Sequence, residues 1–229
     1  LFVKNTGIKD FLLISLFFLY GSCLMANTYY VAPPTASPPG NDSNSGTIDA
    51  PWGTWQKAFN SVVGGDTVFF RGGIYYATTT QTPKNALIGT KNRPICFMNF
   101  QNEEPILDFS RRTSPGPGLQ FSNCENIILK GLTVRNNYQF KEATIEANKY
   151  VFNIYFYFGN NIKIERCKSY NSGRRGFYLY RVDTALIYKC DAWNCADPYS
   201  EAPGNGGDGF IVWDSGTAQD ILSHIVLRQ

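Results

Sequence analysis

Two neighbouring stretches of the chain carry one pattern that decides the fold: Ile162–Asn171 reads IKIERCKSYN, and Leu186–Asn194 reads LIYKCDAWN. When Cys167 is aligned with Cys190, an isoleucine, an aromatic residue and an asparagine also coincide in the two stretches. Self-similarity at a fixed period is typical of a solenoid, in which each repeat buries its apolar face on its neighbour. The pattern therefore predicts adjacent parallel strands, with the two cysteines stacked inside.

An earlier part of the chain extends this repeat. The stretch Asn126–Asn136 matches Asn161–Asn171, with a longer polar excursion, Tyr138–Tyr150, between them that we expect to project from the coil. An asparagine ends each coil segment, at positions 136, 171 and 194. Asparagine amides stacked along a solenoid can hydrogen-bond to one another, so we assign these three residues a structural role.

The composition indicates a folded, all-β protein of one large domain. Of 229 residues, 15% are aromatic and only 17% are charged, which is the reverse of a disordered chain. The net charge of +3 is too small to indicate nucleic-acid binding. His224 is the only histidine of this sequence, so the sequence offers neither a histidine-based catalytic triad nor a zinc site.

The first 26 residues resemble a secretory signal peptide. Lys4 and Lys9 precede an apolar core, residues 11–20, that is too short for a comfortable transmembrane helix. An uncleaved anchor is the alternative. The tripeptide before Leu24 also resembles a bacterial lipoprotein box, which would place a lipid anchor on Cys23. We therefore expect a protein that is secreted, either extracellular or periplasmic, with residues 27–229 forming the β domain.

Both ends of the chain suggest a fragment. The first residue is leucine, and the last six residues look like the middle of a strand. We expect the β domain to be truncated at its C-terminal end, although an alternative start codon could explain the N-terminus. Five cysteines follow the signal segment, and this odd number argues against a complete disulfide framework. Whether Cys167 and Cys190 are bridged stays open, and buried free thiols are the preferred reading.

One helix is predicted near the N-terminus. Within Pro51–Val63, four apolar residues recur at helical spacing, and the pair Gly64-Gly65 follows as a C-terminal cap. The open end of a solenoid exposes its core, and an amphipathic helix is suited to cover it.

This N-terminal region resembles the cap and first coil of secreted carbohydrate enzymes with a right-handed β-helix. The resemblance rests on the order and spacing of five short motifs, namely Gly40–Thr47, Ala50–Trp52, Gln56–Ala58, Gly65–Val68 and Arg71–Tyr75. It implies a right-handed parallel β-helix of the pectin lyase type with one N-terminal capping helix. A fold alone does not determine an activity.

Further along, the chain resembles the polysaccharide lyases of family 9, which include pectate lyases. The resemblance rests on Cys190–Asn194, on Asp197-Pro198 and on Gly206–Phe210, which reads GGDGF. In that family the aspartate of the Asp-Gly-Phe segment is a calcium ligand, which implies this role for Asp208. The other ligands, adjacent aspartates on the next coil, and the lysine base would follow Gln229. The catalytic residues are therefore unknown within this sequence.

Lyase chemistry explains why calcium is implied. β-Elimination removes the proton beside a uronate carboxylate and expels the oxygen at C4, and a hard cation can stabilise the charge that develops. Because Ca²⁺ takes about 6–8 oxygen ligands, one aspartate cannot build the site, and we expect this chain alone to be inactive. The alternative role for Asp208 is a turn aspartate that caps its own backbone. We read Asp197 as the residue that initiates a loop, with a supporting role beside the metal site as the alternative.

Two arginines are candidate substrate-binding residues. Arg174 and Arg175 follow Gly173 in a turn, where they could meet an anionic glycan, although arginines in turns are more often solvated. The expected partner is an acidic polysaccharide, bound by a monomer, with no membrane contact beyond a possible lipid anchor.

Three functions are compatible with these motifs. The preferred one is a calcium-assisted lyase that cleaves a uronate polymer such as pectate. The second is a non-catalytic β-helix, either an adhesin or a glycan-binding surface protein. The third is a glycoside hydrolase on the same fold, which would need paired carboxylates about 5–10 Å apart.

Overall fold

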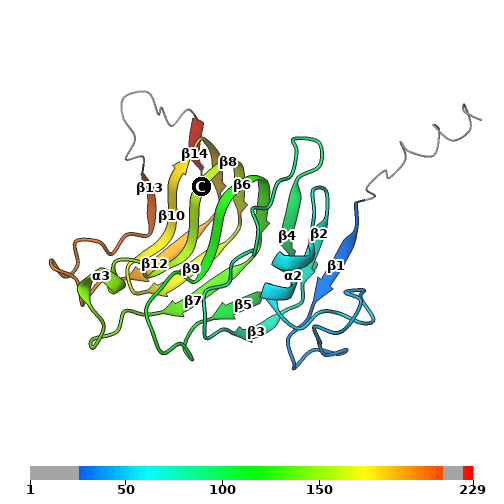
Figure 1. Ribbon diagram of the computed structural model, residues 1–229, viewed down its shortest axis with the longest axis horizontal. Helices are drawn as coiled ribbons and strands as arrows, with labels where there is room; N and C mark the ends of the chain where they lie inside the picture. The colour runs from blue at the N-terminus through cyan, green and yellow to red at the C-terminus, as the bar shows by residue number, and fades with distance from the viewer. Residues whose placement is uncertain (1–25, 214–223, 229) are drawn as a thin grey trace, which may run out of the picture.

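The computed structural model describes residues 26–213, together with the backbone of residues 224–228. Every pairing between the named strands of the described residues is parallel, and the chain winds from one sheet to the other and back as a parallel β-helix (Figure 1). The predicted fold class is therefore confirmed. The predicted signal segment and the candidate lipid anchor at Cys23 lie outside the described residues.

Two sheets make up the coils. The first has the order β1-β2-β4-β6-β8-β10-β13; β11 also pairs with β8, and β14 pairs with β11. Its strands are β1 (Thr28–Val31), β2 (Thr67–Phe70), β4 (Ile95–Asn99), β6 (Leu119–Lys130), β8 (Phe152–Glu165), β10 (Arg175–Val182), β11 (Thr184–Tyr188), β13 (Phe210–Trp213) and β14 (His224–Arg228). The second sheet has the order β12-β9-β7-β5-β3. Its strands are β3 (Gly73–Tyr76), β5 (Pro105–Asp108), β7 (Thr133–Asn137), β9 (Lys168–Ser172) and β12 (Asp191–Cys195).

The strand register confirms the repeat. Tyr170 of β9 faces Trp193 of β12, and their rings stack with centroids 4.3 Å apart. The asparagine ladder also forms, because the side-chain amide of Asn194 donates to the oxygen of Asn171 at 2.6 Å, and Asn171 donates to Asn136 at 2.8 Å. All three adopt left-handed backbone conformations, with φ between 51° and 60°. Asparagine tolerates this conformation better than most residues, so the ladder sets the corners of the coils.

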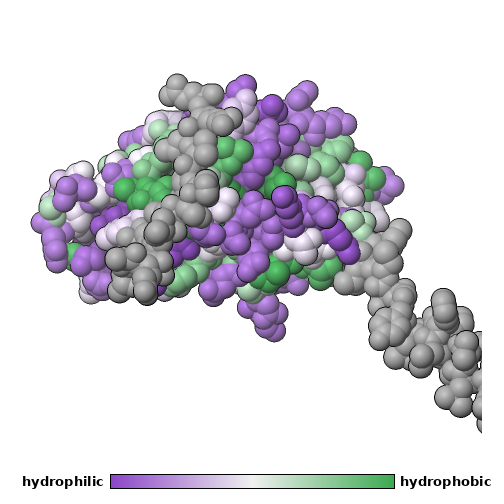
Figure 2. Space-filling view, turned by 90° about the horizontal axis from the view of Figure 1, so that it is seen from above, coloured by the Kyte–Doolittle hydropathy of each residue, from purple (hydrophilic) through white to green (hydrophobic). Residues whose placement is uncertain are grey.

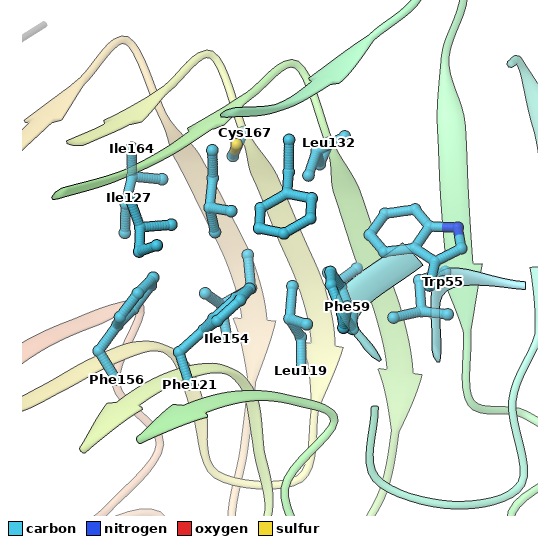
Figure 3. Packing of buried hydrophobic residues seen from close by; sticks show 14 of the residues in the cluster. Trp55, Phe59, Leu119, Phe121, Ile127, Leu132, Ile154, Phe156, Ile164 and Cys167 are labelled. Carbon is cyan, nitrogen blue, oxygen red and sulfur yellow. The ribbon is translucent and has the colours of Figure 1, made fainter. Parts of the chain in front are cut away.

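The interior is a continuous apolar core that runs along the coils (Figure 3). The rings of Phe121 and Phe156 stack in it with centroids 4.9 Å apart. Cys167 is fully buried, and its backbone N–H donates to the sulfur of Cys190 at 3.4 Å. The two thiols thus lie on adjacent coils as predicted, and both are free.

The predicted capping helix is α2 (Trp55–Ser61). Its buried side contacts both sheets. Trp55 packs against Phe70 of the first sheet and Tyr75 of the second, and Phe59 packs against Phe97 of the first. The predicted glycine cap is wrong, because the helix ends at Ser61 and the next residue, Val62, is already extended. Burial of the Val62 side chain in the core explains this early end.

The excursion between the coils has structure of its own. It contains a helix of four residues, α3 (Ile145–Asn148), and projects from one end of the molecule (Figure 1). No helix in the described ranges 26–213 and 224–228 is long and apolar enough to cross a membrane. Hydrophilic residues cover most of the face in Figure 2, with smaller hydrophobic patches between them.

A buried carboxylate makes the stability of the fold depend on pH. Asp108 of β5 is 2% exposed. Burial alone would raise its pKa, but hydrogen bonds from Ser110 and the ion pair with Arg135, 2.6 Å between Oδ2 and Nε, hold that pKa below its usual value. Lysine partners likewise lower the pKa of Glu104 and Glu165.

We therefore expect the melting temperature to fall in acid. Since the folded-state pKa values are depressed, their contribution to stability is present above the unfolded values, about 4, and is lost as the pH falls through the folded values. Thermal melts recorded between about pH 6 and about pH 3 measure this loss of stability. The Asp108→Asn variant should show a shallower pH dependence, whereas the exposed control Asp191→Asn should follow the wild type. Equal slopes for all three proteins would contradict the assignment.

Candidate functional site

The candidate site is an aromatic cleft on the outer face of β8, β10 and β13. Along these strands, alternate residues enter the core, so the residues between them face outward together. The Tyr155 and Tyr178 rings stack with centroids 5.1 Å apart, and the Tyr157 and Tyr180 rings stack at 5.4 Å. Trp213 of β13 meets Tyr180 edge-on at 6.4 Å. The outer face of three parallel strands is therefore a wall of aromatic rings.

This wall lines a cavity of about 570 Å³. Three cations also line it, namely Lys149, Arg174 and Arg175. A hydrogen bond from the Lys149 ammonium group to Glu146 raises the pKa of the lysine, so it stays charged at neutral pH. The cleft thus combines flat apolar rings with positive charge, an arrangement suited to the ring faces and carboxylates of an acidic sugar.

Arg175 lies at the centre of the cleft. It was predicted in a turn, but the register pairs it with Phe152, which makes it the first residue of β10 and buries it. Its guanidinium carbon lies 4.4 Å from the ring centroid of Tyr178 and 5.8 Å from that of Trp213. The alternative of a solvated arginine is therefore wrong for Arg175. A cation placed over aromatic faces is stabilised by their electron density.

Arg174 fastens one wall of the cleft. It donates a hydrogen bond of 2.7 Å from Nη1 to the backbone oxygen of Lys149, in the excursion that carries α3. Partial burial lowers the pKa of its guanidinium, which nevertheless stays protonated near neutral pH. The same excursion binds the loop after β12, because the Gln139 side chain accepts a hydrogen bond of 2.9 Å from the backbone N–H of Tyr199. Two segments far apart in sequence thus form one wall.

The loop after β12 is organised by Asp197. Its carboxylate is 1% exposed and accepts hydrogen bonds from the backbone N–H groups of Gly204 and Gly206, the latter at 2.8 Å, and from the Ser200 hydroxyl at 3.0 Å. This confirms its predicted role in starting the loop. The loop returns to the sheet at Asp208, whose backbone oxygen accepts the N–H of Gly176 at 2.9 Å.

Asp208 lies beside the cationic centre of the cleft. Its side chain is 39% exposed, and Oδ2 lies 3.7 Å from Nε of Arg175. Within the described part of the chain, no backbone N–H donates to this carboxylate, so the turn-capping role is not seen. Nor do residues 26–213 contain a group of three or more histidine, cysteine, aspartate or glutamate side chains that could hold a metal ion. Asp208 alone does not fit calcium, which takes about 6–8 oxygens.

Sequence reasoning named Arg174, Arg175 and Asp208 as separate candidates, which the structure brings together, but it missed the tyrosines. In the sequence, the runs YFYF at 155–158 and FYLY at 177–180 indicate alternating aromatic strands and no more. Their spacing contained the missing signal: when one set of alternate residues fills the core, an equally aromatic second set must face outward.

Comparison with known proteins places the chain in a family. Residues 29–223 match the family described as "Pel9A-like, right handed beta helix region". A pectate lyase of Emericella nidulans, PEL9, is 25% identical over 205 residues, which is 89% of this chain and 47% of that protein.

Solved structures share the fold. A rhamnogalacturonan lyase superposes with a TM-score of 0.61 at 23% identity, over 89% of this chain and 50% of its own. The pectate lyase Pel9A gives 0.52 at 19%, over 74% and 48%. A lacto-N-biosidase from Eubacterium ramulus, a GH136 enzyme, gives 0.59 at 17%, over 73% and 34%. The chain thus spans about half the length of the relatives it matches, or less.

Proposed function

Because the chain belongs to the Pel9A-like right-handed β-helix family, we propose that it is part of a secreted polysaccharide lyase that cleaves a uronate polymer such as pectate by β-elimination. The similarity to a pectate lyase along 89% of the chain supports the substrate class. The observation that carries the proposal is the cleft, where Arg175 lies among aromatic rings beside Asp208.

In this proposal the residues of the chain bind and orient the polymer. Arg174 and Arg175 attract the uronate carboxylates, while the rings of Tyr157 and Tyr180 provide flat surfaces for sugar rings. The sheltered position of Arg175 strengthens its attraction for a carboxylate, because a charge interaction is stronger where water is excluded. The polymer would lie across β8, β10 and β13, at the edge where Asp208 enters.

We also propose that calcium is the cation that would stabilise the charge on the uronate carboxylate during proton removal. Asp208 would supply one of its oxygen ligands. The other ligands and the base would have to come from residues outside the described part, so we assign no step to the metal and no residue as the base. We propose that this chain alone binds the polymer, as a monomer, without cleaving it. Export by the segment 1–26 is likewise proposed.

A glycoside hydrolase is the second enzymatic candidate, since a GH136 enzyme shares the fold. Hydrolysis of this kind needs two carboxylates about 5–10 Å apart. Among the described residues that line the cavity, none is acidic, and Asp208 beside it is a single carboxylate. The similarity to a pectate lyase, 25% identical over 89% of this chain, favours the lyase. A purely binding protein would have the same cleft without catalysis.

Product analysis separates the three functions. Polygalacturonate is incubated with this chain and with the longest product of its gene, with calcium and with a chelator. We expect calcium-dependent unsaturated uronate products, detected by ultraviolet absorbance, from the longer protein alone. New reducing ends without unsaturation would indicate a hydrolase, and binding without any product from the longer protein would indicate a glycan-binding protein. Unsaturated products from this chain alone would contradict the proposed division of roles.

A further inference from the structure

The buried guanidinium of Arg175 lacks one hydrogen-bond partner in the described part of the chain. Its side chain is 9% exposed, and its Nε atom is buried without a hydrogen-bond partner among the described residues. Around it lie the rings of Phe152, Tyr178 and Trp213. Aromatic faces attract a cation, but they do not replace the hydrogen bonds that it makes in water, and a buried charge without them is costly.

Asp208 meets this need only partly. The 3.7 Å between its Oδ2 and Nε of Arg175 is within reach of an ion pair but too long for a hydrogen bond. A bidentate contact between arginine and a carboxylate is shorter and stronger than this one. With 39% of its side chain exposed, Asp208 also keeps access to water. A carboxylate that reaches hydrogen-bond distance can therefore replace Asp208 as the partner of Arg175.

We infer that Asp208 is an internal competitor for the binding of an anionic sugar, and that a uronate carboxylate displaces it from Arg175. This inference rests on the proposed function only in taking a uronate as the ligand. The incoming carboxylate supplies the hydrogen bond that Nε of Arg175 lacks, while the sugar ring lies along the tyrosine wall. Asp208 then turns toward water at small cost, because its side chain is already partly exposed.

The competition has an unusual consequence. Neutralising an acidic residue beside the cleft should strengthen binding when no divalent cation is present. If Asp208 served only as a metal ligand, its replacement would change cation-free binding only through the loss of a nearby negative charge, and that change would not depend on Arg175. The Asp208→Asn variant keeps the shape of the side chain and the backbone hydrogen bonds of the turn, so it changes little besides the charge.

The test is calorimetric titration with trigalacturonate in a chelating buffer. We expect Asp208→Asn to bind about threefold more tightly than the wild type, as expected for loss of a partly exposed ion pair. The control Asp191→Asn makes the same change in net charge at an exposed position on the opposite sheet, and it should bind like the wild type. Unchanged or weaker binding by Asp208→Asn, or an equal gain by Asp191→Asn, would overturn the inference.

Further variants and a neutral ligand locate the effect. Arg175→Gln should weaken binding by at least about tenfold, and the gain from Asp208→Asn should vanish in the double variant. Arg175→Lys keeps the positive charge, so it replaces Arg175→Gln in the test if that variant fails to fold. Arg175→Lys should bind trigalacturonate more weakly than the wild type but retain part of the affinity gain from Asp208→Asn. Methyl-esterified trigalacturonate, which is neutral, should not distinguish Asp208→Asn from the wild type.

These outcomes separate the inference from the function on which it rests. Binding of trigalacturonate that Asp208→Asn does not strengthen would overturn the competition but leave the lyase assignment in place. Failure of the wild-type chain to bind trigalacturonate would overturn the inference and the proposed cleft together. A lyase product from the longer protein without any effect of Arg175 would place the polymer elsewhere on the β-helix.

Discussion

The substitution Phe121→Ala should lower the free energy of unfolding by about 4 kcal/mol, as expected when a buried phenylalanine ring is removed and its cavity cannot collapse. Phe121 is fully buried. Its ring contacts Phe156 on the next coil, at 4.9 Å between centroids, and Phe59 of the capping helix, at 5.4 Å. Figure 3 shows the three rings within one packed cluster. Loss of this ring would therefore weaken both the stacking of coils and the attachment of the cap.

Denaturant unfolding, followed by circular dichroism, measures this effect. The matched control is Ile88→Ala, at a side chain that is 50% exposed, which should change the free energy of unfolding by no more than about 0.5 kcal/mol. Similar effects of the two substitutions would contradict a continuous core that joins cap and coils.

The second large effect is expected at Asp197. Replacement by alanine removes a buried carboxylate that holds two backbone N–H groups and a serine hydroxyl, and leaves those donors without an acceptor. Because hydrogen bonds to charged groups are each worth about 1.5–3 kcal/mol, we expect a loss of about 3 kcal/mol, confined largely to the loop after β12. That loop carries Asp208 to the sheet, so uronate binding should change as well.

A graded series tests this assignment. Ser200→Ala removes one hydrogen bond and should cost least, Asp197→Asn keeps one acceptor and should be intermediate, and Asp197→Ala should cost most. Hydrogen exchange of the Gly204 and Gly206 amides measures the opening of the loop directly. The control Glu201→Ala changes a side chain that is 73% exposed and should leave that exchange unaltered. Protection of both amides in Asp197→Ala would contradict the role of this carboxylate.

Much of the fold could be predicted because a solenoid repeats its local rules. One alignment of two cysteines fixed the register of β9 with β12, and the positive φ of the asparagines follows from their place at the corners. The end of α2 could not be predicted in the same way, since burial of Val62 outweighed the two glycines that follow.

The site was less predictable, because contacts distant in sequence build it. Gln139 meets Tyr199 across 60 residues, and no local pattern indicates that these two loops form one wall. Arg175 shows the same limit. Its neighbours in sequence indicate a turn, but its pairing with Phe152 makes it part of the strand and places it beneath the aromatic rings. Asp208 was identified through family resemblance, since its own surroundings in sequence favour a simple turn.

The location of a bound uronate is the most decisive measurement. A crystal structure of this chain with trigalacturonate should show a ligand carboxylate in hydrogen-bond contact with Arg175, the sugar rings along Tyr157 and Tyr180, and Asp208 turned away from the arginine. Electron density for the ligand on the opposite sheet, or in the cleft with the Arg175–Asp208 pair intact, would contradict the proposed role of this cleft.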